Sequence, residues 1–256
     1  MLFHLIPFPF DSTQVSVDFF QKKSLEFLLF GIQVIHLWHD QWIRSEDIVR
    51  SRISALLGFS TCIPARRTNV LRIDKEQMSG FLSLNHLQGA VTARYAYGLF
   101  YQDQLSAVAS FSAGRLMDRG GVIYRSFELL RYANMLNHTV VGGLGKLITC
   151  FIRKHSPEDI MTYADLDWGS GMGYKKLNFK QTDITPPQIF WVDPQEQVRW
   201  YPHRLPESLI NEFKEQDQSI TIDDFLTRKG YTKIYNAGNL KFLLQVRDMS
   251  DQGESS

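Results

Sequence analysis

The segment that most constrains the fold is a strand that runs into a glycine-rich turn and directly on into a helix. Residues 127–152 read FELLRYANMLNHTVVGGLGKLITCFI, and the turn is Val141-Gly142-Gly143-Leu144-Gly145. Consecutive glycines leave backbone N–H groups exposed at the start of a helix, where the helix dipole also favours an anion. Such a turn has the geometry to hold a pyrophosphate. The alternative is a tight strand-to-helix turn whose glycines serve only the backbone angles.

The elements around this turn predict an α+β fold. Strand patterns occupy residues 69–75, 121–135, 159–166 and 186–194, and an alternating pattern over 95–113 predicts a hairpin that turns at 101–104. Helical patterns occupy 75–87 and 146–155. A strand-rich order with two well-placed helices predicts a mixed, mostly antiparallel sheet flanked by helices.

Three zones can be separated, at 1–62, 65–195 and 196–256. The first reads as helix, strand, helix: one helix stops at Gly31, a β-branched strand covers 32–38, and an amphipathic helix is capped by Ser45. The third is a C-terminal extension of two short helices and a hairpin turning at 236–239, with a polar, disordered tail after Asp248. The first zone is too small to be stable alone, so we expect it to dock on the second.

Charge and cysteine content exclude several classes of protein. Lys and Arg total 28 against 27 Asp and Glu, a net charge of +1, so nucleic-acid contact requires a local basic face. Cys62 and Cys150 lie far apart, which disfavours a disulfide framework or a cysteine zinc site. The apolar start holds two prolines and no basic region, and no stretch is long enough to span a membrane. We therefore expect a cytoplasmic protein without membrane contact.

A second segment, YADLDWGSGMGYKKLNF at 163–179, adds to the glycine turn. Together the two segments resemble the GNAT family of acyl-CoA-dependent acyltransferases, over about half the chain. That family has a pyrophosphate turn of the form Arg/Gln-x-x-Gly-x-Gly/Ala, and here both glycines match while Val140 replaces the Arg or Gln. The family also tends to end in Tyr-x-Lys-Leu-Gly-Phe, and the run that starts at Tyr174 departs only at Asn178.

The resemblance implies a GNAT-like fold and acetyl-CoA or another acyl-CoA as the cofactor. It implies that Tyr174 protonates the departing thiolate and that Glu128 is a general base for an acceptor amine. The alternatives are a Tyr174 that only packs against the sheet and a Glu128 that is a solvated strand residue. The residues implied to hold the cofactor phosphates are Val141, Gly142, Gly143, Leu144, Gly145 and Lys146.

Two further polar groups are candidates for contact with the acceptor. Asp165 and Asp167 are two apart in a predicted strand, so they should share one face and could orient an amine or hold a divalent ion. His86 closes the first helix of the middle zone, where the substrate side of a GNAT-like sheet would lie. The alternatives are a loop cap for the two acids and a helix-dipole partner for the histidine.

A narrower resemblance links the runs NHLQG, ELLRYAN, VVGG and YAD..W....Y.KL.F to phage and mobile-element proteins of the Mom DNA-modification type. In those proteins such a domain follows part of a Vsr-like PD-(D/E)XK nuclease, and the run GIQVIHLWHDQWIRSEDIVRSRISALLG resembles its last strand and helix. The relatives carry an acidic pair where this chain has His39-Asp40. We interpret the first zone as a nuclease remnant kept for docking or DNA contact, without a metal site.

Arginines support the same hypothesis, because a planar guanidinium suits phosphate recognition. The five predicted nucleic-acid contacts are Arg50, Arg66, Arg67, Arg94 and Arg115, although acids among them also fit an ordinary solvated surface. The leading hypothesis is transfer of an acyl-type group from a CoA-type donor to an exocyclic amine of DNA. The alternatives are an N-acyltransferase acting on a protein or small amine, and a non-catalytic DNA-binding module of a mobile element. The oligomeric state stays open.

Overall fold

The computed structural model describes residues 1–216 and 219–246, and the chain forms two compact units that interleave along the sequence. Unit 1 comprises Met1–Arg44, Ala164–Met172 and Ile184–Leu240, and unit 2 comprises Ser45–Tyr163, Gly173–Asp183 and the chain from Lys241. The sequence suggested consecutive zones at 1–62, 65–195 and 196–256. The units differ from these zones because strands that are distant along the chain pair with one another. The tail expected after Asp248 lies outside the described residues.

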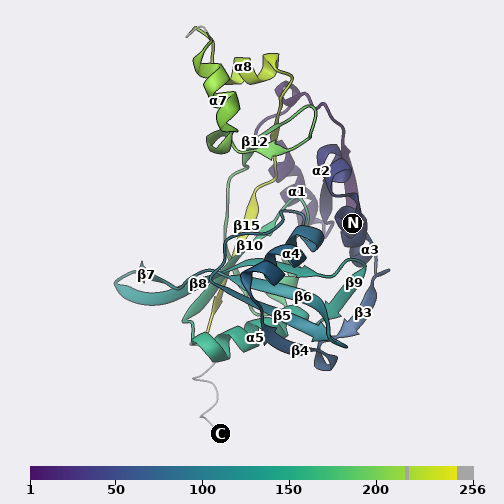
Figure 1. Ribbon diagram of the computed structural model, residues 1–256, viewed down its shortest axis with the longest axis vertical. Helices are drawn as coiled ribbons and strands as arrows, with labels where there is room; N and C mark the ends of the chain where they lie inside the picture. Colours follow the sequence, from purple (N-terminus) through teal and green to yellow (C-terminus); the bar gives the residue numbers. More distant parts are fainter. Residues whose placement is uncertain (217–218, 247–256) are drawn as a thin grey trace. The chain divides into compact units, whose positions relative to one another are not determined.

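A mixed, mostly antiparallel sheet forms the body of unit 2 and confirms the predicted α+β class (Figure 1). The strand order is β11-β15-β10-β8-β6-β5-β4, and β7 pairs with β8. β8 and β10 are parallel, whereas β4 to β8 pair antiparallel with their neighbours. The strands are β4 (Asn69–Arg72), β5 (Tyr95–Tyr101), β6 (Gln104–Phe111), β7 (Arg115–Arg119), β8 (Val122–Asn134), β10 (Asp159–Asp165), β11 (Lys180–Ile184) and β15 (Asn239–Gln245).

Two helices cover opposite faces of this sheet. On one face, α4 (Lys75–Asn85) packs Met78 and Leu82 against a cluster that includes Val108 of β6. On the other face, α5 (Gly143–His155) stacks Phe151 on Phe111 of β6, with ring centroids 3.9 Å apart. Val108 and Phe111 point to opposite faces because three positions separate them on one strand. We call these the α4 face and the α5 face.

A bulge in β8 decides which side chains share a face. The register with β6 skips Leu130, so Leu129 and Arg131 pair with successive residues of β6. The extra residue breaks the alternation of side chains along the strand. Glu128 and Arg131 therefore lie on the α4 face, whereas Leu129 and Tyr132 lie on the α5 face.

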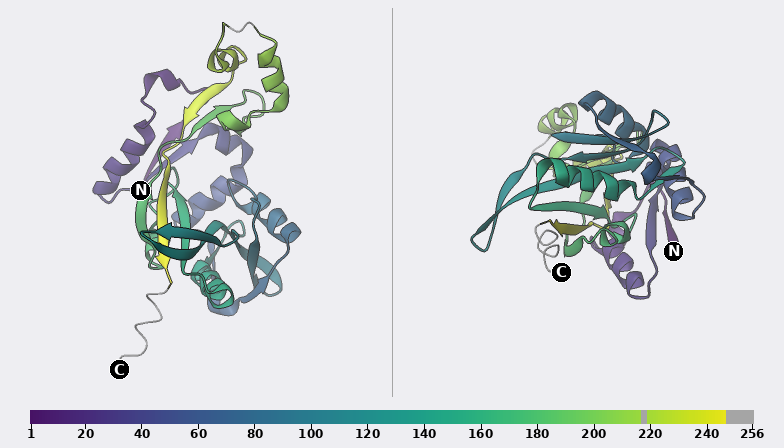
Figure 2. Two further views of the ribbon diagram at one scale, coloured as in Figure 1. Left: turned by 90° about the vertical axis from the view of Figure 1, so that its left-hand side faces the viewer. Right: turned by 90° about the horizontal axis from the view of Figure 1, so that it is seen from below.

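The remaining elements of unit 2 flank the glycine turn or extend from the sheet. β3 (Thr61–Pro64) pairs in parallel with β9 (His138–Val141), which leads into α5. The short helix η2 (Ala65–Arg67) follows β3, α3 (Glu46–Leu56) precedes it, and α6 (Met172–Lys175) carries Tyr174. The β7–β8 hairpin, whose first strand the sequence did not predict, extends beyond the rest of the sheet (Figures 1 and 2).

Unit 1 begins with a β–α–β arrangement. β1 (Leu2–Ile6) pairs in parallel with β2 (Val34–Trp38), and α1 (Phe19–Leu29) connects them after η1 (Ser12–Gln14). α2 (His39–Arg44) follows. The second part of the unit is a three-stranded sheet with α7 (Glu207–Lys214) and α8 (Ile222–Arg228), joined by a cluster around Trp191, Leu209 and Phe225. Its strands are β12 (Ile189–Val192), β13 (Arg199–Trp200) and β14 (Thr232–Tyr235), with η3 (Pro202–Arg204) after β13.

The hairpin predicted to turn at 236–239 is wrong. β14 pairs with β12, whereas β15 lies between β10 and β11, so the two strands diverge. The loop between them bonds to other segments: Asn236 Oδ1 accepts the Gln188 N–H at 2.7 Å, and the Leu166 N–H donates to the Gly238 carbonyl at 3.0 Å. Within residues 1–216 and 219–246, no helix is long and apolar enough to cross a membrane.

Candidate functional site

The glycine turn of unit 2 joins β9 directly to α5. Gly142 is the N-cap of α5 with φ of +78°, a left-handed conformation that favours glycine, and the helix begins at Gly143, three residues earlier than the sequence predicts. The first N–H groups of a helix have no acceptor within it. That of Leu144 bonds to the Tyr132 hydroxyl, which itself donates to Asn134 Oδ1 at 2.9 Å. For the N–H groups of Gly143 and Gly145 the described residues supply no acceptor.

Close packing also favours glycine at the two other positions. A Cβ on Gly143 would lie 2.9 Å from the Tyr132 hydroxyl and 3.0 Å from the Val140 Cβ. A Cβ on Gly145 would lie 3.0 Å from Leu177 Cδ2, in the segment that contains Tyr174. The two segments that the sequence singled out are thus in contact. Because each glycine has a structural reason, the glycines alone do not identify a phosphate site.

Lys146, which the resemblance implies to hold the cofactor phosphates, has its side-chain ammonium bound elsewhere. Lys146 Nζ donates to the Ala65 carbonyl at 2.8 Å and to the Thr68 carbonyl, so the ammonium holds η2 against the turn. Val140, in the position of the family's Arg or Gln, is 3% exposed. By contrast, Val141 is 56% exposed, which leaves the turn accessible from solvent.

Tyr174 lies where β8 and β10 separate. The parallel ladder ends at Leu129 and Thr162, and beyond it β8 continues to Asn134 without a β10 partner in the described chain. Thr162 Oγ1 donates to the Leu129 carbonyl at 2.9 Å, and the Tyr174 hydroxyl is in hydrogen-bond contact with the same threonine side chain. Burial raises the pKa of Tyr174 above its ordinary value, so the phenol keeps its proton at neutral pH.

The Tyr174 ring also packs within the sheet, as the alternative prediction has it. Its centroid lies 5.6 Å from that of Phe179 and 5.5 Å from that of Phe242 in β15. This packing fixes the direction of the hydroxyl. Tyr132 is a neighbour of Tyr174, since burial and then the charge of an ionised Tyr174 raise the pKa of Tyr132. The sequence did not mark Tyr132, which reaches this place through the bulge at Leu130.

A charged group lies on the α4 face of the same opening. Burial raises the pKa of Glu128 above its ordinary value, against the opposing effect of Arg115 and Arg131. A carboxylate of raised pKa is a better proton acceptor than an ordinary surface glutamate. The hydroxyl of Ser112 accepts the Glu128 N–H at 2.9 Å and holds this part of β8 in place.

His86 stays uncharged at the end of α4. Burial, followed by the positive charges of Arg131 and Arg52, lowers its pKa to about 3. Its Nδ1 accepts the Gln88 N–H at 3.1 Å, which places the remaining proton on Nε2. A neutral imidazole with one nitrogen occupied is suited to closing the helix, so we assign it no proton transfer.

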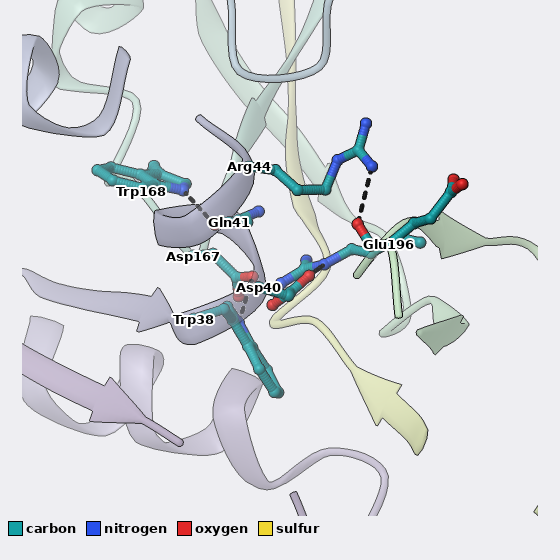
Figure 3. A network of polar contacts seen from close by, with 8 residues as sticks. Trp38, Asp40, Gln41, Arg44, Asp167, Trp168 and Glu196 are labelled. Atoms are coloured by element: carbon teal, nitrogen blue, oxygen red, sulfur yellow. Dashed lines mark hydrogen bonds and ion pairs between the residues drawn. The ribbon is translucent and has the colours of Figure 1, made fainter. Parts of the chain in front are cut away.

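Asp167 belongs to unit 1, and its carboxyl is buried and hydrogen-bonded to neighbouring residues (Figure 3). The predicted contact of this carboxyl with the acceptor does not fit these surroundings. The residue is 1% exposed, and its carboxyl accepts the Ala237 N–H at 2.7 Å and the Trp38 Nε1–H at 3.2 Å. Burial, and then the charge of Asp165, raises the pKa of Asp167. The two acids do not share a strand face, because β10 ends at Asp165 and Asp167 lies in the following turn.

Asp40, in the first zone, also has a structural role, as the partner of Arg199 in an ion pair. Asp40 Oδ2 accepts from Arg199 Nε at 2.6 Å and Asp40 Oδ1 from Arg199 Nη2 at 2.9 Å, and Asp40 is 3% exposed. Within the described part of the chain, no group of three or more His, Cys, Asp and Glu side chains could hold a metal ion.

The five predicted nucleic-acid arginines have different surroundings in unit 2. Arg50 pairs with Glu46 at 2.6 Å, and the Arg67 guanidinium lies 5.1 Å from the centroid of the Tyr101 ring. Arg66 is its exposed neighbour in η2. Arg94 lines a pocket, and Arg115 acts electrostatically on Glu128.

Comparisons with known proteins found similarity only to solved structures, and at a low level. No family model and no curated protein matches this chain. Among solved structures, an acetyltransferase from Bacillus subtilis in complex with CoA is 11% identical over 70% of this chain and 99% of its own, with a TM-score of 0.40. A GNAT family acetyltransferase from Elizabethkingia anophelis with acetyl-CoA bound is 11% identical over 70% of this chain and 99% of its own, with a TM-score of 0.37. The KacTA–DNA complex is 18% identical over 58% of this chain and 99% of its own, with a TM-score of 0.33. Likenesses at this level carry no conclusion about what this chain binds or catalyses.

Proposed function

We propose that this chain is a GNAT-type N-acyltransferase that uses an acyl-CoA. One observation carries the proposal: a half-buried, protonated phenol, Tyr174, lies where the β8–β10 ladder opens, in a segment that packs against the start of α5. An opening between two strands gives a thioester access to both faces of the sheet. Glu128 lies on one of these faces, so a proton acceptor and a proton donor are available at the same opening.

The turn offers a donor set that suits the diphosphate of an acyl-CoA. The Gly143 and Gly145 N–H groups lie at the positive end of α5, and Val141 and Gly142 are exposed there. Val140 supplies no cation, but η2 does. The Cβ of Ala65 would lie 3.6 Å from a Cβ on Gly142, and Arg66 and Arg67 follow Ala65 directly. We assign the diphosphate to these amides and this pair of arginines.

The residues of the opening divide the proton transfers between them. A bound acyl-CoA supplies an acyl group activated as a thioester. Glu128 accepts a proton from the attacking amine, whose nitrogen forms the new bond to the acyl carbon. Tyr174 donates its proton to the sulfur as the C–S bond breaks. The raised pKa of each group suits its task, because the glutamate becomes a stronger base and the phenol keeps its proton.

For the acceptor, we propose an exocyclic amine of a DNA base, as in the Mom-type resemblance. Arg115 and Arg131 beside Glu128 provide positive charge where a phosphate backbone would approach. A base in a duplex would have to be flipped out to reach the opening. Among the aromatic residues that could support a flipped base, Trp168 is excluded, because it is 3% exposed and its Nε1–H donates to Gln41 at 3.3 Å. In this proposal the first zone is the remnant of a Vsr-like nuclease.

Two measurements test the proposal and separate its alternatives. Calorimetry with acetyl-CoA should give saturable binding, and Tyr174→Phe should keep that binding while acyl transfer falls about 10²–10⁴-fold. Tyr201→Phe, which also removes a half-buried phenolic hydroxyl, is the matched control and should change neither. Absence of acetyl-CoA binding would instead favour a non-catalytic DNA-binding module.

The acceptor is tested by mass spectrometry of nucleosides from cells that express the chain. A new acylated nucleoside that disappears with Tyr174→Phe supports DNA as the acceptor. Acetyl-CoA binding with unmodified nucleosides favours a protein or small-amine acceptor and rejects the DNA assignment.

A further inference from the structure

A pocket of about 420 Å³ lies in unit 2 between the start of α4 and the start of β5, outside the opening described above. Its volume is in the range of sites that bind small ligands or parts of larger ones. Three cations line it: Arg72 at the end of β4, Lys75 at the first position of α4, and Arg94 just before β5. Among the residues that the structure describes, none of the three has an ion-pair partner.

The lining is strongly unbalanced in charge. Asp74 is the one acidic residue of the lining, and its Oδ1 accepts the Gln77 N–H at 2.8 Å as the N-cap of α4. Three positive charges around one recess repel one another, and an anion bound among them relieves that repulsion. The pocket therefore suits an anionic ligand.

The walls also suit the sugar and base that accompany a phosphate. Ile73, Met78 and Ala96 form a buried floor, which is part of the cluster under α4. Tyr95 also lines the pocket, but its ring lies on the α5 face, where the Arg72 guanidinium is 5.7 Å from its centroid. A cationic rim above an apolar floor matches a nucleotide unit better than a bare inorganic anion, because the floor offers apolar contact to the sugar and base.

Positive charge continues beyond the pocket. The Tyr95 ring lies 4.2 Å from the ring of His155, between centroids. Burial, and then the charges of Arg72, Arg125 and Lys154, lowers the pKa of His155, which shows that these three cations share one neighbourhood. The row of cations thus extends past a single recess, and a polymer with regularly spaced phosphates can engage more of it than a free nucleotide can. It also supplies the local basic face that a chain of net charge +1 needs.

We propose that this pocket, which we call the Arg72–Arg94 pocket, binds a phosphate and its nucleotide within a nucleic-acid strand. The choice of a nucleic-acid ligand rests on the proposed DNA acceptor. The pocket itself lies apart from the Tyr174 opening and takes no part in proton transfer.

The test is fluorescence anisotropy with a labelled single-stranded oligonucleotide, titrated over a series of KCl concentrations. The test variant is Arg72→Gln/Lys75→Gln/Arg94→Gln. The matched control, Lys22→Gln/Lys23→Gln/Lys229→Gln, also removes three positive charges. Each of these lysines belongs to unit 1 and has a carboxylate partner there. Loss of three phosphate contacts should weaken binding about a hundredfold near 0.1 M KCl and reduce the salt slope by about 2. The control should keep wild-type affinity within about threefold, since its charges lie outside the proposed contacts.

Further arms distinguish the sources of phosphate. Adenosine monophosphate and inorganic phosphate should compete only weakly with the oligonucleotide, and full competition by either would reassign the pocket to a free nucleotide or phosphate. If the triple variant does not fold, Arg94→Glu alone changes an exposed side chain and should still lower affinity at least tenfold.

Acetyl-CoA calorimetry on the same variants separates this inference from the proposed transferase. Loss of oligonucleotide binding with intact acetyl-CoA binding supports the pocket assignment. Equal loss of both overturns it, because the pocket would then serve the CoA. A wild-type protein that binds acetyl-CoA but no oligonucleotide overturns the inference and leaves the transferase standing. Pocket-dependent oligonucleotide binding without acetyl-CoA binding supports the inference and rejects the transferase.

Discussion

Replacing Arg199 with methionine removes the positive charge that faces the buried carboxylate of Asp40. The two side chains are 15% and 3% exposed and form a bidentate pair, with N–O distances of 2.6 and 2.9 Å. The guanidinium carbon also lies 5.2 Å from the Trp38 ring centroid and 5.8 Å from that of Phe190. Methionine keeps the apolar stem of the arginine but leaves the carboxylate without its partner.

The cost follows from this burial. Leaving one member of a buried ion pair without its partner destabilises by about 3–5 kcal/mol. The double variant Asp40→Leu/Arg199→Met removes both charges and should recover most of that loss, since well-packed apolar replacements of buried pairs are often neutral. Arg44→Gln is the control: Arg44 donates to the Glu196 carbonyl at 3.0 Å in an exposed setting, so it should cost at most about 1 kcal/mol.

Urea unfolding of wild type, Arg199→Met, Asp40→Leu, the double variant and Arg44→Gln measures these free energies directly. The reasoning fails if Arg199→Met costs less than about 1 kcal/mol, or if the double variant is as unstable as the sum of its single changes. Either result would mean that Asp40 is not held by Arg199 in solution.

Three further changes test the site and its surroundings. Gly143→Ala would place a methyl group 2.9 Å from the Tyr132 hydroxyl, so it should destabilise unit 2 by about 1–3 kcal/mol in urea unfolding and weaken acetyl-CoA binding in calorimetry; wild-type values for both would contradict the packing at this turn. The pKa of Glu128 is raised, so wild-type acyl transfer should increase with pH above the ordinary glutamate range, and a pH–rate profile of Glu128→Gln should lack that rise; an unchanged profile would exclude Glu128 as the base. Burial and the charge of His4 lower the pKa of His36 from 6.5 to about 4. Between these two pH values the unfolded chain binds a proton at His36 and the folded chain does not, so the free energy of unfolding decreases as the pH falls from 6.5 to about 4. His36→Gln should therefore show a shallower loss of stability across that window than wild type in urea titrations, and parallel curves would contradict the buried neutral imidazole.

Local sequence rules identified the elements whose signals are local. Gly31 lies just beyond α1, and the polar turn at 101–104 joins the antiparallel β5 and β6, as the sequence predicts. β1 was missed because five residues ahead of two prolines give no strand signal, and its partner β2 lies about thirty residues further on. The loop after β14 looked like a hairpin turn because Asn236 and Gly238 are turn residues. They do form a local hydrogen bond, from the Gly238 N–H to Asn236 Oδ1 at 3.0 Å, but their other bonds go to segments that the sequence alone does not bring together.

The site shows the same division in β8. Strict alternation from Phe127 puts Leu129, Arg131 and Ala133 on one face of the strand. The bulge at Leu130 moves Arg131 to the face of Glu128 and places Tyr132 beside the glycine turn. A bulge depends on how a strand pairs with its neighbour, so no pattern within β8 announces it. Glu128 and Tyr174 could be selected from the sequence, but the groups around them could not.

The pairing of β9 with β3 explains why a valine occupies position 140. Val140 pairs with Ile63 in the parallel β3–β9 ladder, and its N–H donates to Asn134 Oδ1 at 3.1 Å, so a buried apolar side chain is required there. An arginine in its place would bury a charge without a partner. The same ladder ends at Pro64, and η2 with Arg66 and Arg67 follows at once beside the glycine turn. The pairing that removes a cation from position 140 thus brings two cations to the turn from another part of the chain, and the departure from the family pattern is no argument against an anion there.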